Sequence, residues 1–395
     1  MSDILMEKLL GLPEFEVTDF KQNDYDMGFY VQAKQRPGLC PACGVVEPRL
    51  SIYKSRTQNI RYMNVQNKRV ALILTRRYYR CTECNSCFSE PLESVHDRDR
   101  MTIRLRNHIA LRARFTSFVD IENEYQISDT TIRKAFLEDV AKLPTFSELE
   151  TPRILGIDEI CLKKNEFSRK QPWAVIANGD ARTVMDMLKE RSKPNIISSL
   201  QSLRHPQKVE VVTMDMWPAY RNAVYETLPN ALPVIDKFHV VKMANEQLDS
   251  KRRSICNKAP AGLKRNKAIF LKREHKLSEK ALQLRDEWFE AYPVLQKNYE
   301  LKESFYRIYD CTSREEAERY FIDWQRSIPC NAGSEYNGWR MLASTVRRCK
   351  NEIFNYFEVP YTNAFVEGLN SAIRVIASQG RGYDFEELRG KVLLT

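Results

Sequence analysis

The stretch RILGIDEICLKK, residues 153–164, places two acids inside an apolar run of strand length. Asp158 and Glu159 lie near its middle, between Ile157 and Ile160. An acid in such a strand needs a partner or a metal ion, because an unpaired buried charge is costly. A capping or surface acid is the more common role of a single Asp, and a buried hydrogen-bonded pair also remains open. Asp158 is therefore a candidate metal ligand whose partners must come from elsewhere in the chain.

The residues that follow alternate between strand and helix patterns. We expect two further strands in QPWAVIANGDART (171–183) and TVMDMLKERS (183–192), and then a helix in NIISSLQSL (195–203). KVEVVTMDMWPAYRNAVYETL (208–228) predicts a strand, then Asp215, then a helix opened by a proline, and ALPVIDKFHVVK (231–242) predicts another strand. Three strands, a helix and two more strand-helix steps are the order of the ribonuclease-H-like fold.

That fold predicts which acids meet. Its first strand carries an acid at the centre, its fourth strand carries a second acid beside the first, and a later helix presents a third. The corresponding residues are Asp158, Asp215 and Glu367. Three carboxylates are hard oxygen ligands that suit Mg²⁺ or Mn²⁺, and two such ions can clamp the attacking and leaving oxygens of a phosphoryl transfer. Asp236 and His239 also lie at a strand end, where a position near this site and a structural role are both open.

The helix that carries Glu367 has two distinct faces. In TNAFVEGLNSAIRVIAS, residues 362–378, a polar stripe is formed by Asn363, Glu367, Asn370, Arg374 and Ser378. The opposite side is apolar, and we expect it to pack on the sheet; it comprises Phe365, Leu369, Ala372, Ile373 and Ile376. A merely solvated face usually carries scattered Lys, Arg and Glu. We therefore expect Asn363, Asn370 and Arg374 to contact the metal shell and the DNA phosphates.

Two cysteine pairs near the N-terminus predict a metal site. CPACG (40–44) and CTECNSC (81–87) give C-x2-C, a spacer, and C-x2-C-x2-C. Each pair can lie on a tight turn, and two such turns complete a closed, structural four-cysteine zinc site. The strand-like spacer run RVALILTRRYYRC (69–81) favours a zinc-ribbon hairpin. We expect Cys40, Cys43, Cys81 and Cys84 as ligands, with Cys87 as an alternative; unconnected buried thiols are the other possibility.

Composition limits the class of protein. With 395 residues the chain is long enough for two or three domains, and a hydrophobic content of 43% suffices for real cores. No run of roughly 18 apolar residues is present, so we expect no membrane span. The N-terminus does not have the pattern of a secretory signal. We therefore expect a reducing cytosol, in which the remaining five cysteines are simply packed.

The net charge of +10 is concentrated in two blocks. Nine Lys or Arg and no acid lie between Arg49 and Arg80, and eleven basic residues face three acids between Lys242 and Lys276. Two solvated surfaces would have the same composition, but two basic blocks in one chain favour a polyanion such as double-stranded DNA. The first block contains a basic strip beside two tyrosines, which is either a contact for the DNA backbone or an ordinary exposed strand: Arg76, Arg77 and Arg80.

Residues 100–145 predict a helix-turn-helix. A basic helix near 103–111 precedes a second helix over 117–125, and Ser128 is a natural N-cap for a third helix over 129–140. Apolar residues repeat every four positions in the third helix and are expected to face the core: Ile132, Phe136 and Val140. The outward residues near its start are candidates for DNA contact, although an ordinary helical hairpin has a similar pattern: Thr130, Thr131, Arg133 and Lys134.

Taken in order, these motifs resemble the DDE transposases of bacterial insertion sequences, and specifically the ISL3 family. The resemblance extends from about residue 40 to the end, and DKFHVVK (236–242) and the TN-x3-E-x2-N block (362–370) are its most specific parts. It implies a protein of the bacterial cytoplasm, associated with the nucleoid, that binds terminal inverted repeats through its N-terminal domains and assembles at least as a dimer on DNA. It also implies Mg²⁺-dependent DNA cleavage and strand transfer by Asp158, Asp215 and Glu367.

We therefore expect a multidomain α/β protein: an N-terminal segment (1–39), a zinc-binding domain (40–95), a helix-turn-helix domain (100–145) and a ribonuclease-H-like catalytic domain (151–240 and 351–395) with an α-helical insertion (241–350). A non-catalytic DNA-binding protein on the same scaffold, such as a domesticated transposase or a repressor, is the main alternative. A nuclease or resolvase of similar fold would cut without strand transfer.

Overall fold

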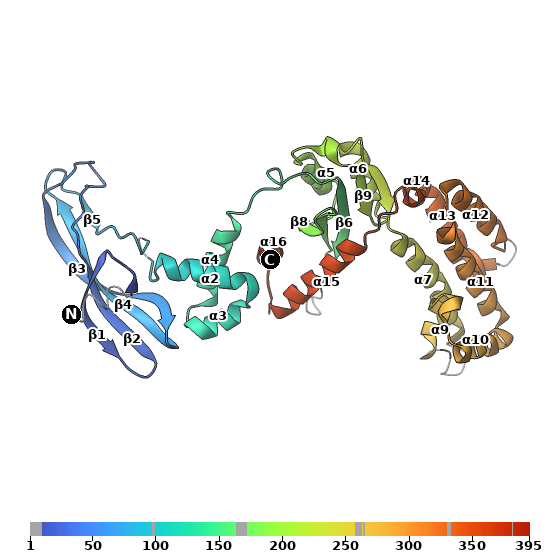
Figure 1. Cartoon of the computed structure of the whole chain (residues 1–395), viewed down its shortest axis with the longest axis horizontal. Coiled ribbons are helices and arrows are strands. Elements are labelled where there is room, and N and C mark those ends of the chain that lie inside the picture. The colour runs from blue at the N-terminus through green and yellow to red at the C-terminus, as the bar shows by residue number, and fades with distance from the viewer. Residues whose placement is uncertain are drawn as a thin grey trace. The chain divides into compact units, whose positions relative to one another are not determined.

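The structure is a computed structural model that describes residues 10–96, 99–162, 172–256, 263, 265–329, 333–380 and 382–395 (Figure 1). Cys330, the end of the strand expected over 153–164, and the first nine residues of the expected N-terminal segment lie outside the described residues. The chain forms two compact units. Unit 1 comprises Met1–Leu143 and Ile376–Thr395, and unit 2 comprises Pro144–Val375.

Unit 1 contains a mixed sheet whose strands run in the order β1-β2-β4-β3, with β5 paired to β4. Its strands are β1 (Phe15–Gln22), β2 (Asp26–Ala33), β3 (Leu50–Val65), β4 (Lys68–Cys81) and β5 (Cys87–Ser89). The long β3-β4 hairpin confirms the predicted strands of the spacer. Its two-residue turn has positive φ at Gln66 (50°) and Asn67 (61°), the backbone that suits the twist of paired strands. Because β2 pairs in parallel with β4, the boundary expected at residue 39 does not separate two domains.

Three helices follow the sheet, as the helix-turn-helix pattern predicts: α2 (Ile103–Phe115), α3 (Phe118–Tyr125) and α4 (Asp129–Val140). Ser117 caps α3, and Gln126 turns the chain toward α4 in the left-handed conformation. Ser128 occupies the N-cap of α4, but its hydroxyl bonds to the hydroxyl of Thr131 rather than to the backbone. The three residues expected to face the core from α4 are all buried: Ile132, Phe136 and Val140.

The C-terminal helix α16 (Phe385–Leu394) belongs to unit 1, although residues 351–395 were expected in the catalytic domain. Lys391 is buried, and its ammonium donates to the carbonyls of Ala113 (2.5 Å) and Thr116 (2.9 Å) at the end of α2. Gly390 lets α16 approach α4, since a Cβ at this position would lie 2.4 Å from the side chain of Val140. These contacts make α16 a fourth helix packed with α2 and α4 in unit 1.

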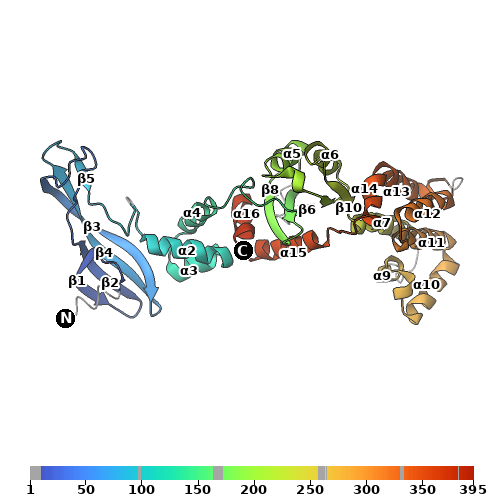
Figure 2. The same ribbon diagram turned by 45° about the horizontal axis from the view of Figure 1, so that its top comes forward.

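Unit 2 is built on a five-stranded sheet in the order β10-β9-β6-β7-β8. Its strands are β6 (Ile154–Ile160), β7 (Trp173–Asn178), β8 (Thr183–Leu188), β9 (Val211–Met214) and β10 (Leu232–Ile235). β6, β7 and β8 are antiparallel neighbours, whereas β9 and β10 run parallel to β6. All five strands were predicted, but the strand expected over 231–242 ends at Ile235, and a helix begins at Lys237. Helices α5 (Lys193–Gln201) and α6 (Pro218–Thr227) lie side by side, and their apolar faces share one core with the sheet (Figures 1 and 2).

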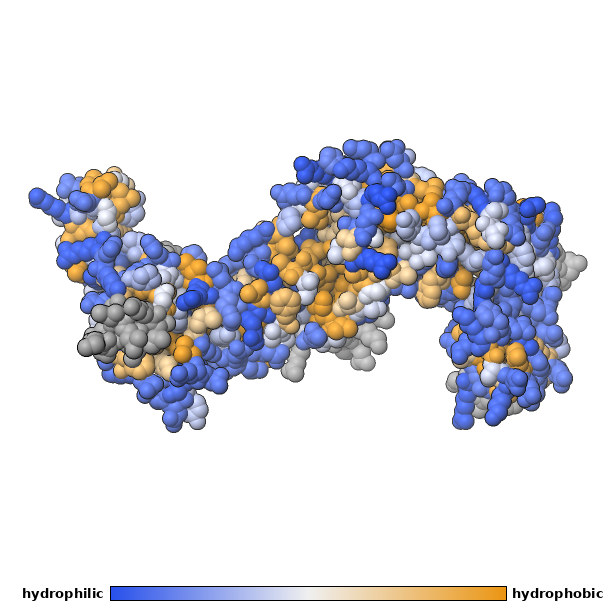
Figure 3. Space-filling model, in the orientation of Figure 1, coloured by the Kyte–Doolittle hydropathy of each residue, from blue (hydrophilic) through white to orange (hydrophobic). Residues whose placement is uncertain are grey.

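The stretch expected to be a helical insertion is helical. It contains α7 (Lys237–Cys256), α9 (Lys267–Leu271), α10 (Glu279–Ala291), α11 (Pro293–Arg307), α12 (Arg314–Ser327), α13 (Asn337–Arg348) and α14 (Lys350–Phe354). One aromatic core, which includes Phe305, Trp324 and Trp339, holds these helices together, while their outer surface is mostly hydrophilic (Figure 3). No helix in the described ranges is both long enough and apolar enough to cross a bilayer.

Candidate functional site

Asp158 lies in the central strand β6 and is only 4% exposed. The backbone N–H of Glu159 donates to its Oδ1 (2.8 Å), and Nδ2 of Asn370 donates to its Oδ2 (2.9 Å). Burial raises the pKa of this carboxyl to about 7, and the charges of Asp215 and Glu367 act in the same direction against an opposing effect of His239. Asp158 is thus a buried acid with hydrogen-bond donors and with two other acids nearby.

Asp215 comes directly after β9, next to Asp158 in register. Ile157 pairs with Met214 across the two parallel strands, so the following residues, Asp158 and Asp215, lie on neighbouring strands. The backbone N–H of Trp217 donates to Oδ1 of Asp215 (2.8 Å) and fixes the carboxylate at the start of α6. Burial raises the pKa of Asp215, and the hydrogen bond from Trp217 opposes this.

Glu367 is brought to the sheet by α15 (Ala364–Gln379). Gly156 permits this approach, because a Cβ on it would lie 2.4 Å from Val366 and 2.7 Å from Phe365. Glu367 is half-buried, and its charge contributes to the raised pKa of Asp158. The three acids predicted from the sequence therefore interact electrostatically. Among the described residues, only the four cysteines form a group whose ligand atoms all lie within 4.8 Å of one another. The oxygens of the three acids therefore do not all lie within that distance.

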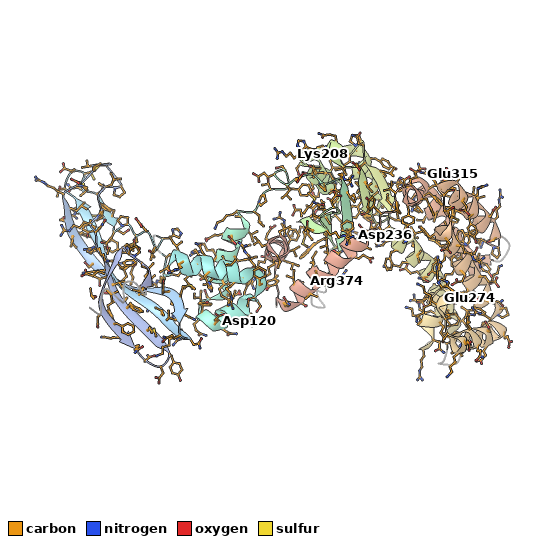
Figure 4. The ribbon with its side chains drawn as sticks, viewed as in Figure 1. Asp120, Lys208, Asp236, Glu274, Glu315 and Arg374 are labelled. Carbon is orange, nitrogen blue, oxygen red and sulfur yellow. The ribbon has the colours of Figure 1, made fainter. Side chains whose placement is uncertain are left out.

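The predicted orientation of α15 is only partly right, because Ile373 is buried as expected whereas Ala372 is exposed. Val366, Asn370 and Ile373 are its buried residues, so the asparagine side of the helix faces the sheet. Asn363, just before the helix, is 0% exposed; its Oδ1 accepts from the hydroxyl of Thr213 (2.8 Å) and its Nδ2 donates to the carbonyl of Ile157 (3.4 Å). Asn363 is thus held in the core, and Asn370 contacts the candidate metal ligand Asp158. Contact of either side chain with DNA stays a prediction. Arg374 is exposed, as expected (Figure 4).

A cavity of about 280 Å³ lies beside Asp215 and contains residues that sequence reasoning missed. Arg191 and Trp217 line it, and the guanidinium of Arg191 stacks 4.1 Å from the centre of the indole. His239 lines it as well, and its Nδ1 is 3.7 Å from Asp236. The nearby Asp236 carboxylate raises the pKa of His239, and the charges of Asp158 and Asp215 add to this effect. His239 therefore lies near the acids, one of the two positions that the sequence left open. For Trp217, its place two residues after Asp215 was a signal that could have been read from the sequence.

The four predicted cysteines form one cluster in unit 1, in which the sulfurs of Cys40, Cys43, Cys81 and Cys84 all lie within 4.8 Å of one another. Each C-x2-C pair lies on a tight turn, closed by hydrogen bonds from Gly44 N to Cys40 O (2.9 Å) and from Asn85 N to Cys81 O (2.9 Å). Hydrogen bonds from Ser86 lower the pKa of the Cys84 thiol to about 6, which favours the thiolate that binds metal. The donor set is consistent with a structural zinc ion. Cys87 is exposed and lies outside the cluster.

Two of the three arginines in the basic strip of β4 bind partners within unit 1. Arg76 is 3% exposed and donates to the carbonyl of Glu90 (2.9 Å), and Arg77 pairs with the Glu90 carboxylate (2.5 Å). Arg80 is exposed and stacks on Tyr53. The prediction of an exposed strip is therefore wrong for Arg76 and Arg77. The alternation of Val70, Leu72, Leu74 and Arg76 along one strand face was a signal for the burial of Arg76.

In α4, Thr130 and Lys134 are exposed and Thr131 is half-buried, as expected for outward residues. Arg133 differs, because its guanidinium forms ion pairs with Asp129 and with Glu387 of α16 and lies 5.0 Å from the ring of Phe118. These partners raise its pKa. Arg133 therefore fastens α16 to α4 within unit 1.

Comparison with known proteins places these observations in a family. The ISL3-type DDE transposase family, described as "Transposase", matches residues 155–392. The family described as "zinc-finger of transposase IS204/IS1001/IS1096/IS1165" matches residues 36–84, which include all four clustered cysteines. The chain is similar to the transposase for insertion sequence element IS1001 of Bordetella parapertussis, with 23% identity over 376 residues, or 91% of this chain and 89% of the relative. The chain therefore belongs to the ISL3 family of DDE transposases and carries the zinc ribbon of that family at its N-terminus.

Proposed function

We propose that this chain binds the terminal inverted repeats of its insertion sequence and catalyses metal-dependent DNA cleavage and strand transfer. The observation that carries the proposal is the buried carboxyl of Asp158, held by Asn370 and surrounded by the charges of Asp215 and Glu367. The strand order of unit 2 supports a ribonuclease-H-like catalytic domain. Three acids whose charges destabilise one another are expected where a cation binds.

Asp158, Asp215 and Glu367 would hold Mg²⁺ or Mn²⁺, whose donor preference they meet as hard oxygen ligands. The ions would neutralise charge on the phosphate and activate the attacking oxygen. The chain itself orients the ligands: Asn370 fixes Oδ2 of Asp158, and the N–H of Trp217 fixes Oδ1 of Asp215. Such positioning is the main contribution that a protein makes to phosphoryl transfer.

Four exposed or half-buried residues remain candidates for DNA contact in unit 1: Arg80, Thr130, Thr131 and Lys134. Thr130, Thr131 and Lys134 lie near the start of α4, the part of a recognition helix that reaches the major groove. In unit 2, Arg374 remains a candidate for contact with phosphates. We further propose that the protein acts in the bacterial cytoplasm, at the nucleoid, and as at least a dimer, because two element ends must be joined together.

The test uses the full-length protein and a labelled duplex that carries the inverted repeat flanking its own gene. We expect nicked and strand-transferred products with Mg²⁺, none with EDTA, and a loss of roughly 10³-fold or more in the Asp158→Asn variant. Asp186→Asn is the matched control, because Asp186 is a buried acid of the same sheet whose Oδ1 accepts from the next backbone N–H (Met187, 2.7 Å). It should keep its activity.

The other outcomes separate the alternatives. Specific binding without products under any metal would overturn catalysis and leave a non-catalytic DNA-binding protein. Cleavage without joining would indicate a nuclease or resolvase. Equal loss in Asp158→Asn and Asp186→Asn would mean that the first variant acts through folding and not through the site.

A further inference from the structure

The cavity beside Asp215 has one flat aromatic wall that no part of the proposed metal chemistry uses. Trp217 is 41% exposed, although it lies two residues after a buried acid and its backbone N–H is bound to that acid. The indole is held in place on one side, since the guanidinium of Arg191 stacks on it at 4.1 Å and also pairs with Glu159. A large exposed ring that is fixed in orientation is a ready surface for stacking.

The remaining lining favours an uncharged planar ligand over a phosphate. Three acids, Glu159, Asp215 and Glu246, line the cavity together with Arg191, His239 and Lys242, so its charges are mixed rather than positive. Met216 and Met243 add apolar surface. A nucleobase combines flat faces for stacking with donors and acceptors at its edge, which such a lining can satisfy.

The size of the cavity agrees with a single base. Its volume of about 280 Å³ is at the lower end of ligand pockets, which begin at roughly 300 Å³. A base inside a duplex has both faces covered by its neighbours, so only an unpaired base can present a face to Trp217. Lys242 is exposed and makes no ion pair within the described part of the chain, which leaves its ammonium available to the phosphate of the same nucleotide.

We propose that Trp217, supported by Arg191, stacks an unpaired nucleobase of the DNA next to the bond that is cut, with Lys242 contacting the adjoining phosphate. This inference rests on the proposed function, since it places the base beside the proposed catalytic acid. It assigns Trp217 a role in holding the DNA end in an opened conformation. Arg191 is a positioning residue that keeps the indole flat against the cavity.

The test measures binding in buffer without Mg²⁺ or Mn²⁺ and without chelator, so that it does not depend on cleavage and the zinc site is left intact. The probes are inverted-repeat duplexes with one unpaired nucleotide at successive positions around the expected cleavage point, each made with a normal base and with an abasic residue. We expect the wild-type protein to bind the base-containing probe about tenfold more tightly at one or two adjacent positions. Trp217→Ala should bind both probes equally, whereas Trp217→Phe should keep most of the preference.

Two further variants serve as controls. Met341→Ala shortens a 70% exposed apolar side chain on α13, away from the cavity lining, and should behave as the wild type. Lys242→Ala should weaken binding to both probes alike and reduce the salt dependence of binding by about one ion. If Trp217→Ala keeps the base preference, or if the wild type has no preference at any position, the inference is wrong. A base preference in a protein that never cleaves DNA would instead uphold the pocket and overturn the proposed catalysis.

Discussion

The cysteine cluster of unit 1 and the acids of unit 2 are two ligand sets that differ in how the chain gathers them. The four sulfurs come from two short turns, one between β2 and β3 and one after β4, and lie within 4.8 Å of one another. The three acids come from β6, the end of β9 and α15, and they are positioned by hydrogen bonds from Asn370 and Trp217. The first set is closed around a single point, whereas the second is spread around a surface.

This difference separates a structural site from a functional one. A closed set of four thiolates leaves no ligand position for a substrate. Burial first, and the charges of Asp215 and Glu367 in addition, raise the pKa of Asp158. Such a set of acids leaves positions open for ions and DNA. The cysteines should therefore govern stability, and the acids should lower stability in exchange for function.

The largest effect is expected from the cysteines. Replacing Cys40 and Cys43 with serine should remove the bound zinc, and the end of the sheet that holds the cluster should unfold, because a structural zinc site contributes on the order of 10 kcal/mol. Zinc content per chain and limited proteolysis of residues 36–89 measure the two effects. If the metal-free variant resisted protease as well as the wild type, the cysteine cluster would not be a structural site, and the contrast with the acids would be wrong.

Asp158→Asn should stabilise the protein in the absence of metal while it abolishes activity. The pKa of Asp158 in the folded state, about 7, lies above its ordinary value of 3.8. The contribution of the protonated Asp158 carboxyl to the free energy of unfolding is thus fully present below about pH 4 and is lost as the pH rises through 7. The asparagine does not ionise, so we expect the variant to exceed the wild type by about 1–3 kcal/mol at pH 8 and to match it near pH 4.

Denaturant unfolding at several pH values, in buffer without Mg²⁺ or Mn²⁺ and without chelator, measures this difference. A gap between variant and wild type that stays constant with pH would show that the Asp158 carboxyl is not strained by its surroundings.

Replacing the two asparagines near the acids, Asn363 and Asn370, should have different effects. Asn363→Ala removes hydrogen bonds to Thr213 and Ile157 in the core and should destabilise unit 2 by about 2–3 kcal/mol. Asn370→Ala removes a donor to the Asp158 carboxylate and should raise the pKa of Asp158 further. DNA affinity without Mg²⁺ or Mn²⁺, measured where both variants remain folded, should stay unchanged. A tenfold loss of affinity in Asn363→Ala would instead restore the contact predicted from the sequence.

The smallest effect is expected at Cys87. This thiol is exposed and outside the cluster, so Cys87→Ser should change the free energy of unfolding by less than about 0.5 kcal/mol. Zinc content should equal that of the wild type. Loss of zinc in this variant would mean that Cys87 replaces one of the four clustered cysteines as a ligand.

Features that depend on neighbouring residues in the chain could be predicted from the sequence. The C-x2-C turns, the β3-β4 hairpin, the core face of α4 and the succession of strands and helices along unit 2 follow from local spacing, turn residues and periodicity. The acids at 158 and 215 could be placed side by side only because the element order matched the ribonuclease-H-like fold, and the register of β6 with β9 agrees with that placement.

Features that depend on partners far along the chain needed the tertiary structure. Periodicity counted Asn363 and Asn370 as a polar surface, but hydrogen bonds to Thr213 and Asp158, more than a hundred residues away, make their burial favourable. In the same way, Arg77 is partly buried because it pairs with Glu90, and Lys391 of α16 is buried against the ring of Phe118. Burial of a polar side chain is favourable only where hydrogen-bond partners are present. Those partners come from distant parts of the chain, so the pattern of one segment cannot reveal them.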